Sequence, residues 1–267
     1  MTARTRGPKH AIVRFYAELN DMLPPDRRGK PFFHPFTGHV AVKDMIEGLG
    51  VPHTEVDLVL INGVSAEFEQ LVKDMDRISI FPVFEALDIS ALQKVRPEPL
   101  RLLSFVLDVH LGRLAKYLRL LGFDTLYDRK FADAELAEIS SSGRILLTRD
   151  RGLLKRKAIT HGYLIRSVKP RHQVVEVMRR FDLAKQTNPF TRCLSCNEPL
   201  RRISKNQIMD RVEDRTRRFY DEFSICSGCD KVYWKGSHYM AMKTLVNAIK
   251  SELGNKTPGS SESRTSS

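Results

Sequence analysis

The four cysteines of the chain form two identical pairs, Cys193-x-x-Cys196 and Cys226-x-x-Cys229, with 29 residues between them. Each pair can turn two thiolates toward one point, so two pairs supply the four ligands of a tetrahedral structural zinc site. Disulfide bonds are the alternative, but they require an oxidising compartment, and the N-terminus lacks the apolar segment of a signal peptide. The spacing therefore favours Zn²⁺ in a closed site that leaves no position for a substrate.

A second set of residues able to do chemistry consists of carboxylates near the ends of expected strands. Asp108 ends the first strand of an expected parallel sheet, Asp150 follows the third, and Asp133 and Glu135 open the helix between them. Ligands of open parallel sheets bind at the carboxyl ends of the strands. Carboxylates that converge there repel one another unless a hard cation such as Mg²⁺ or Mn²⁺ neutralises them. Such a cation supports attack of water on a phosphodiester.

Each of these acids also has a purely structural interpretation. Asp108 and Asp150 precede helical segments and could simply cap them. Asp133 and Glu135 fall in a first helical turn, where acidic side chains are favoured in any case. The catalytic interpretation therefore depends on a shared location of the acids at one edge of the sheet.

The net charge of +12 is unevenly distributed along the chain. Residues 1–90 hold 10 basic and 13 acidic side chains, whereas residues 91–267 hold 34 and 19, which gives −3 against +15. A basic region of this kind attracts a polyanion, most plausibly nucleic acid, although a solvated basic surface is the simpler alternative. Basic residues close to the acids in sequence could hold backbone phosphates. They are Arg113, Lys116, Arg149, Arg151, Lys155, Arg156 and Lys157.

The segment between the cysteine pairs is basic, and two aromatic residues follow the second pair. Tyr233 and Trp234 could stack on the bases of single-stranded RNA, or they could pack the cysteine module against the sheet. The sequence has no run of roughly 18 apolar residues, so a membrane partner is not expected. The basic residues of the segment between the two cysteine pairs are Arg201, Arg202, Lys205, Arg211, Arg215, Arg217 and Arg218.

Hydrophobic periodicity divides the chain into two α/β regions. The first reads as strand, helix, strand and strand around an Asn62-Gly63 turn, which indicates a small β-grasp sheet. The second alternates strands and helices, as a doubly wound parallel sheet does. We expect strands at 11–16, 57–61, 77–83, 101–107, 125–127, 144–147 and 163–166, and helices at 42–49, 111–121, 134–141 and 171–181.

These elements predict a modular chain. We expect a β-grasp domain at 9–90, a proline-containing linker at 91–100, the parallel-sheet domain at 101–185, a cysteine module at 186–250 and a disordered tail at 251–267.

Four segments resemble the mutator-seven C-terminal RNase domain, a PIN-like nuclease family. They are residues 108–125 (DVHLGRLAKYLRLLGFDT), 146–151 (LLTRDR), 190–197 (FTRCLSCN) and 226–238 (CSGCDKVYWKGSH). Their order and spacing together make coincidence improbable. The N-terminal region resembles the ubiquitin-like domain that is often fused to this family. It also resembles the β-grasp sulfur carriers, but it lacks their free Gly-Gly tail, so a docking or substrate-guiding role is expected.

The resemblance implies a PIN-like α/β domain with a zinc ribbon that acts on RNA with Mg²⁺ or Mn²⁺. Asp108 and Asp150 match the acidic positions of the family, Asp133 is the preferred third acid, and Glu135 is a possible additional one. We therefore expect a cytoplasmic ribonuclease with RNA as its partner and a possible protein partner for the β-grasp domain. The alternative is a non-catalytic RNA-binding or ribosome-associated adaptor on the same scaffold.

Overall fold

The computed structural model describes residues 8–82 and 103–254. They fall into two compact units, one made of the chain up to Leu111 together with Tyr127–Ile165, the other of Gly112–Leu126 and the chain from Arg166 onward. The expected linker at 91–100 lies outside the described residues. Helix α7 (Ser237–Gly254) continues past residue 250, so the first four residues of the expected tail are helical.

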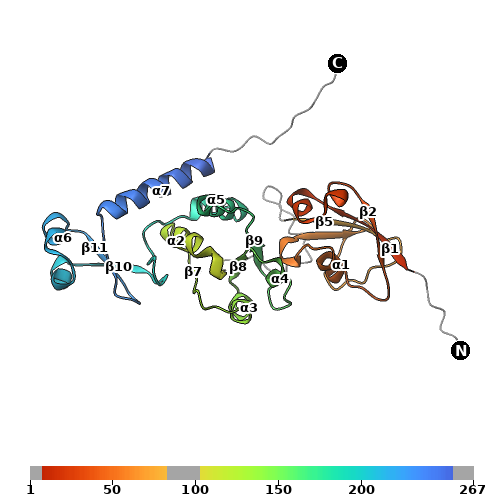
Figure 1. The fold of residues 1–267 in the computed structure, drawn as a ribbon, viewed down its shortest axis with the longest axis horizontal. Coiled ribbons are helices and arrows are strands. Elements are labelled where there is room, and N and C mark those ends of the chain that lie inside the picture. Colours follow the sequence, from red (N-terminus) through yellow and green to blue (C-terminus); the bar gives the residue numbers. More distant parts are fainter. Residues whose placement is uncertain (1–7, 83–102, 255–267) are drawn as a thin grey trace, which may run out of the picture. The chain divides into compact units, whose positions relative to one another are not determined.

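The first unit begins with a five-stranded sheet in the order β2-β1-β5-β3-β4 (Figure 1). The central pair, β1 and β5, is parallel, and the other pairs are antiparallel. Asn62 and Gly63 both have positive φ, as a type I′ hairpin turn between β3 and β4 requires. The elements are β1 (Lys9–Phe15), η1 (Ala17–Met22), η2 (Pro25–Arg27), β2 (Phe32–Phe36), α1 (Val42–Gly48), η3 (His53–Glu55), β3 (Leu58–Ile61), β4 (Val64–Ser65) and β5 (Arg77–Phe81).

The sequence analysis did not predict strand β2, which pairs antiparallel with β1. Its sequence, FFHPF, contains Pro35, and proline is normally evidence against a strand. Because β2 lies at the edge of the sheet, the missing N–H of Pro35 costs no hydrogen bond between central strands.

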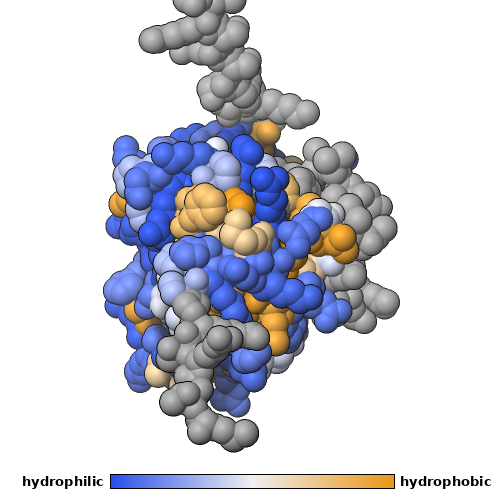
Figure 2. All heavy atoms as spheres, turned by 90° about the vertical axis from the view of Figure 1, so that its right-hand side faces the viewer, coloured by the Kyte–Doolittle hydropathy of each residue, from blue (hydrophilic) through white to orange (hydrophobic). Residues whose placement is uncertain are grey.

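The face in Figure 2 is mainly hydrophilic, with apolar residues in small separate groups.

The first unit continues with a parallel sheet in which β8 pairs with β6 on one side and β9 on the other. All residues of these three strands are buried, as their mainly apolar sequences predict. Helix α3 packs on β6 and β8, and α4 packs on β8 and β9. The elements are β6 (Phe105–Leu107), η4 (Val109–Leu111), α3 (Asp133–Ser141), β8 (Ile145–Thr148), α4 (Arg151–Leu154) and β9 (Gly162–Leu164).

Within this unit, the short helix η3 lies against strand β9. The backbone N–H of Leu164 donates to Glu55 Oε1 at 2.5 Å, and His53 Nε2 lies 2.8 Å from the carbonyl oxygen of Ile159. His53 and Glu55 are buried. A strand edge exposes unpaired backbone groups, and Glu55 satisfies one of them on β9, while His53 bonds the loop that precedes this strand.

The second unit contains two packed helices, α2 and α5, followed by a three-stranded antiparallel sheet in the order β10-β11-β12 and by α7, which packs on α5. None of the described helices combines the length and apolar composition needed to cross a membrane. The elements are α2 (Gly112–Leu120), β7 (Thr125–Leu126), α5 (Pro170–Arg180), η5 (Ala184–Gln186), β10 (Leu200–Ile203), η6 (Lys205–Arg211), α6 (Asp214–Phe219), β11 (Phe223–Cys226), β12 (Val232–Trp234) and α7.

Candidate functional site

Asp108 and Asp150 both follow strands that end at the same edge of the parallel sheet. In the parallel pairing of β6 with β8, Leu107 lies opposite Leu147. The next residues, Asp108 and Thr148, are therefore neighbours, and Asp150 follows two positions later. The expected position of these two acids at the carboxyl ends of adjacent strands agrees with the pairing register.

The hydroxyl of Thr148 connects the two acidic residues. It donates a hydrogen bond to Asp108 Oδ2 at 2.8 Å and accepts one from the backbone N–H of Asp150 at 2.9 Å. Thr148 is fully buried and Asp108 is 8% exposed, so this hydrogen bond holds the Asp108 carboxylate in a fixed orientation. The Asp108 side chain thus bonds to the neighbouring strand β8.

Asp150, in contrast, does cap a helix. Its Oδ1 accepts a hydrogen bond of 2.7 Å from the backbone N–H of Gly152 in the first turn of α4. This is the structural alternative that the sequence offered. A cap uses one carboxylate oxygen, so the exposed Asp150 side chain keeps acceptor capacity for a further ligand.

Asp133 and Glu135 have partners of their own at the start of α3. Asp133 Oδ2 forms an ion pair of 3.1 Å with Arg156, and both side chains are about half exposed. Glu135 Oε2 accepts from the backbone N–H of Ala132 at 2.8 Å and so caps the helix. Among the described residues, the carboxylates form no group of three or more close enough to share a cation, so no three of Asp108, Asp133, Glu135 and Asp150 meet at one point.

A further carboxylate, Asp128, follows strand β7 by two residues. Asp128 is exposed and accepts from the backbone N–H of Lys130 at 2.9 Å. Its neighbour Tyr127 donates through its hydroxyl to the carbonyl oxygen of Val109, the residue after Asp108. Asp128 follows a strand as Asp108 does, and this position is the sequence signal that would have added it to the candidate acids.

The basic residues expected to hold phosphates are found in both units. Arg113 and Lys116 are exposed on α2 of the second unit, and Arg149 is exposed beside Asp150 in the first. Arg151 is instead bound to the backbone, because its guanidinium donates to the carbonyl oxygen of Met22 at 3.3 Å. Arg151 is therefore less available to a phosphate than Arg149.

The four cysteines meet at one point in the second unit. Their sulfur atoms all lie within 4.8 Å of one another, with 3.6 Å between Cys193 and Cys229 and 3.2 Å between Cys196 and Cys226. All four are free thiols. A tetrahedral zinc ion with Zn–S bonds of about 2.3 Å requires sulfur atoms about 3.8 Å apart. The cluster can therefore hold a metal such as zinc.

The protonation of the cluster also fits a cation site. Burial raises the pKa of Cys193, but hydrogen bonds from Tyr233 and from the backbone N–H groups of Ser195 and Cys196 lower it to about 6. Burial and the neighbouring thiols raise the pKa of Cys196 to about 12. Four thiolates this close together repel one another, so a central divalent charge is needed for all of them to ionise.

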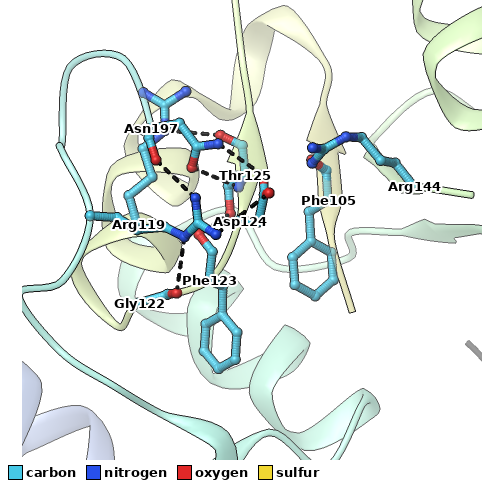
Figure 3. Close-up of polar contacts among 9 residues, drawn as sticks. Phe105, Arg119, Gly122, Phe123, Asp124, Thr125, Arg144 and Asn197 are labelled. Carbon is cyan, nitrogen blue, oxygen red and sulfur yellow. Dashed lines mark hydrogen bonds and ion pairs between the residues drawn. The ribbon is translucent and has the colours of Figure 1, made fainter. Parts of the chain in front are cut away.

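Asn197, the residue after the first cysteine pair, is bonded to the loop that follows α2 (Figure 3). The buried Arg119 guanidinium donates to the carbonyl oxygens of Leu194 and Ser195 at 3.2 and 2.9 Å. Asn197 accepts from the backbone N–H of Thr125 at 2.8 Å and donates to Asp124 at 2.9 Å. These contacts determine the position of the cysteine pair relative to α2, and no periodicity in the sequence reveals them.

The two cysteine pairs turn in the same way. The residue after each second cysteine has positive φ, with 78° at Asn197 and 56° at Asp230. Asn and Asp adopt this left-handed conformation more readily than most other residues. The residue types at these two positions thus explain how each pair turns its sulfur atoms toward the common centre.

The two aromatic residues after the second pair have different environments. The Tyr233 hydroxyl lies 3.1 Å from Cys193 Sγ and accepts from the backbone N–H of Leu194 at 3.2 Å. Trp234 has no such role and is 39% exposed. Tyr233 therefore supports the cysteine cluster, whereas Trp234 presents an aromatic surface to solvent.

Comparisons with known families account for nearly all of the described chain. Residues 103–246 match the Mut7-C RNAse domain, and residues 8–88 match the Mut7-C ubiquitin domain. Searches of curated proteins and of solved structures give no significant match. The expected fold class is confirmed: an N-terminal ubiquitin-like β-grasp domain, then a PIN-like α/β domain with a parallel sheet and a clustered cysteine module. The parallel strand ends, the four clustered thiols and the match over more than half of its length show that the chain belongs to the Mut7-C RNase domain family.

Proposed function

We propose that this protein is a divalent-metal-dependent ribonuclease that binds RNA through a basic zinc ribbon. The observation that carries the proposal is the Thr148 hydroxyl, which joins the Asp108 carboxylate to the backbone of Asp150 at the ends of adjacent parallel strands. The family match supports a nuclease-type activity. The net positive charge of residues 91–267 supports a polyanionic substrate.

Asp108 and Asp150 would hold the catalytic cation, and Asp133 is the third candidate ligand. Mg²⁺ commonly binds through one or two carboxylates and keeps several waters, so two acids at one strand edge fit this ion. When bound, Mg²⁺ or Mn²⁺ would supply Lewis-acid stabilisation of the charge that develops on the phosphoryl oxygens. Arg156 neutralises Asp133 in this structure, and Glu135 serves the helix. The proposed acids are therefore ranked Asp108, Asp150, Asp133 and then Glu135.

The remaining side chains would position RNA. Arg149, which is exposed beside Asp150, can bind a backbone phosphate at the strand edge. Arg113 and Lys116 can bind phosphates along α2, and Arg151 contributes less because it is bonded to Met22. Zn²⁺ held by the four cysteines would stabilise the ribbon. It would not act on RNA itself, because a closed four-thiolate site leaves no position for a substrate.

Several expectations from the sequence remain part of this proposal. They are the domain boundaries at 9–90, 91–100, 101–185 and 186–250, a cytoplasmic location, and a protein partner for the ubiquitin-like domain.

The proposal is tested by incubating the purified full-length protein with Mg²⁺ or Mn²⁺ and RNA. Wild-type protein should cleave, and the Asp108→Asn and Asp150→Asn double variant should bind RNA without cleaving it. Asp44→Asn, an exposed acid on α1, is the matched control and should cleave normally. Equal cleavage by the double variant would reject the assignment of these acids.

A non-catalytic RNA-binding or ribosome-associated adaptor is the second candidate function. The observation in its favour is that the described carboxylates do not form a group of three around one point. Calorimetry with Mn²⁺ separates the two functions. A ribonuclease should show a saturable site that Asp108→Asn removes, whereas an adaptor should show none.

A further inference from the structure

The ribbon sheet has two different faces. Across the strands, Arg202 pairs with Ser224 and Ser224 pairs with Tyr233, so these three side chains lie in one row on the same face. The opposite face carries Ile203, Phe223 and Val232, which pack with Ile208 of η6 in a small hydrophobic core. Only one face of the sheet is therefore filled by its own core.

The face that carries the Arg202 row borders a cavity of about 490 Å³. This volume lies in the range of about 300–1,000 Å³ that is typical of ligand pockets. Every residue that lines the cavity belongs to the second unit. The aromatic lining residues outside the ribbon core are Phe190, Tyr233, Trp234 and Tyr239. Phe223 also borders the cavity, but its side chain packs in the core on the opposite face of the sheet.

Two of the aromatic rings form a wall. The ring centroids of Phe190 and Tyr239 are 4.4 Å apart, with a tilt of 40° between the planes. Phe190 has a φ of 64°, a strained conformation for a bulky residue, and a 3.0 Å hydrogen bond from its N–H to the carbonyl oxygen of Leu120 holds it there. The fold thus maintains a strained backbone at the position that places this ring in the cavity.

The floor and the rim are also fixed. The hydroxyl of Tyr233 is bonded at the cysteine cluster. At Gly236, an added Cβ would lie 2.8 Å from Trp234 Nε1, so only glycine leaves room for the indole in this position. Rings that are already held in place lose little conformational entropy when a planar ligand stacks on them.

The charges around the cavity leave one arginine available. Asp221 is paired with Lys205 and Glu222 with Lys235 at 2.8 and 2.5 Å. Arg202 is exposed and forms no ion pair with a carboxylate of the described chain, although Glu222 is within electrostatic reach. An anionic group of a ligand would therefore meet the exposed Arg202 guanidinium, which lines the cavity.

We propose that this cavity is a nucleotide pocket, in which one base of single-stranded RNA inserts among the aromatic rings and its phosphate binds Arg202. Aromatic stacking combined with a nearby cation is how proteins hold unpaired bases. This inference rests on the proposed RNA-binding role of the ribbon, but it does not depend on the acids of the parallel sheet. It assigns the RNA-binding function to a defined pocket in the ribbon.

The test uses the single tryptophan of the chain, which lines the cavity, as a fluorescent reporter. The full-length zinc-loaded protein is titrated with adenosine 5′-monophosphate and, in parallel, with ribose 5-phosphate. We expect saturable quenching by the nucleotide and much weaker binding of the sugar phosphate, which lacks a base. Equal binding of the two compounds would overturn the base pocket in favour of a simple anion site.

Two matched pairs of variants locate the binding. Arg202→Gln should weaken nucleotide binding about tenfold, whereas Arg201→Gln, the same change on the opposite face of β10, should not. Tyr239→Leu should weaken it by a similar factor because one stacking ring is lost, and Met240→Leu, exposed next to it on α7, should not. Equal weakening by both arginine variants would show general electrostatic attraction and reject the pocket.

The outcome is separable from the nuclease proposal. The Asp108→Asn and Asp150→Asn double variant should bind the nucleotide as the wild type does. Saturable, Arg202-dependent binding without RNA cleavage by the wild type would reject the nuclease and support the pocket. Cleavage of RNA without saturable, Arg202-dependent nucleotide binding would support the nuclease and reject the pocket. Zinc content and thermal unfolding show whether each variant is folded.

Discussion

The cysteine cluster and the acidic strand edge are both candidate metal sites, but only the cysteine cluster has all of its expected ligands close together. The four thiols face one another within 4.8 Å. The acids have other partners, since Asp108 is bonded to Thr148, Asp150 to Gly152 and Asp133 to Arg156. A structural metal holds the fold together and needs its full set of ligands, whereas a catalytic metal must keep positions free for substrate and water.

Removal of one thiol from the cysteine cluster should have a larger effect than any single change at the acidic strand edge. Cys196→Ser leaves three thiolates, so we expect loss of zinc and unfolding of β10, β11 and β12. Zinc contributes about 10–16 kcal/mol to the folding of zinc-finger peptides, more than a small ribbon can replace. Metal analysis and hydrogen exchange measure the result. Ser227→Ala, inside the second cysteine pair, is the control and should keep its zinc.

Loss of the Thr148 hydroxyl should affect the acidic edge by a smaller amount. Thr148→Val leaves a nearly buried Asp108 carboxylate without its 2.8 Å hydrogen bond. We expect a loss of about 1–3 kcal/mol in unfolding free energy and about 10- to 100-fold slower RNA cleavage. Denaturant unfolding and cleavage rates check both values. Thr148→Ser keeps the hydroxyl and should restore most of the activity; failure to do so would mean that the methyl group matters more.

The two regions should also respond to acid through different groups. Burial lowers the pKa of His53 in the folded protein, although the hydrogen bond between its Nδ1 and the Glu47 carboxylate opposes this shift. The unfolded chain then binds more protons below a pH of about 6.5, so the free energy of unfolding of the first unit should fall as pH drops from 7 to 5. His53→Gln should flatten this dependence. Acid should affect the ribbon by protonating thiolates, which is measured as zinc release and should not change in that variant.

The smallest effect is expected for the ion pair on α3. Arg156 and Asp133 are both about half exposed, so Arg156→Gln should change the unfolding free energy by less than about 0.5 kcal/mol. The Arg156→Gln variant is more informative about the proposed metal site than about stability. If Asp133 is a ligand, its release from Arg156 should tighten Mn²⁺ binding in calorimetry. Unchanged affinity would remove Asp133 from the proposed ligand set.

Much of the cysteine module could be predicted from the sequence because its geometry is local. Each Cys-x-x-Cys pair forms a turn over a few residues, and Asn197 and Asp230 provide the backbone conformation that closes it. The position of Asp108 beside β8 was also predictable, because parallel strands end at a common edge. Strand β2 was missed because Pro35 suppresses a strand prediction wherever the strand lies.

Contacts between side chains that are distant in sequence could not be predicted. Arg119 was assigned only to the helix that contains it, yet it binds the carbonyl oxygens of Leu194 and Ser195. Tyr233 was expected either to stack on RNA or to pack the module, and the structure places its hydroxyl at Cys193. Both roles depend on chain segments that approach only after folding.

The sequence by itself determined the family, the two cysteine pairs, the alternation of strands and helices, and the acids that end the strands. These properties follow from local spacing and from the period of apolar residues. Only the tertiary structure decided that Thr148 joins Asp108 to Asp150, that Arg156 holds Asp133, and that one face of the ribbon sheet borders a cavity. Hydrogen bonds, ion pairs and cavities depend on distances between residues far apart in the chain, and only packing sets those distances.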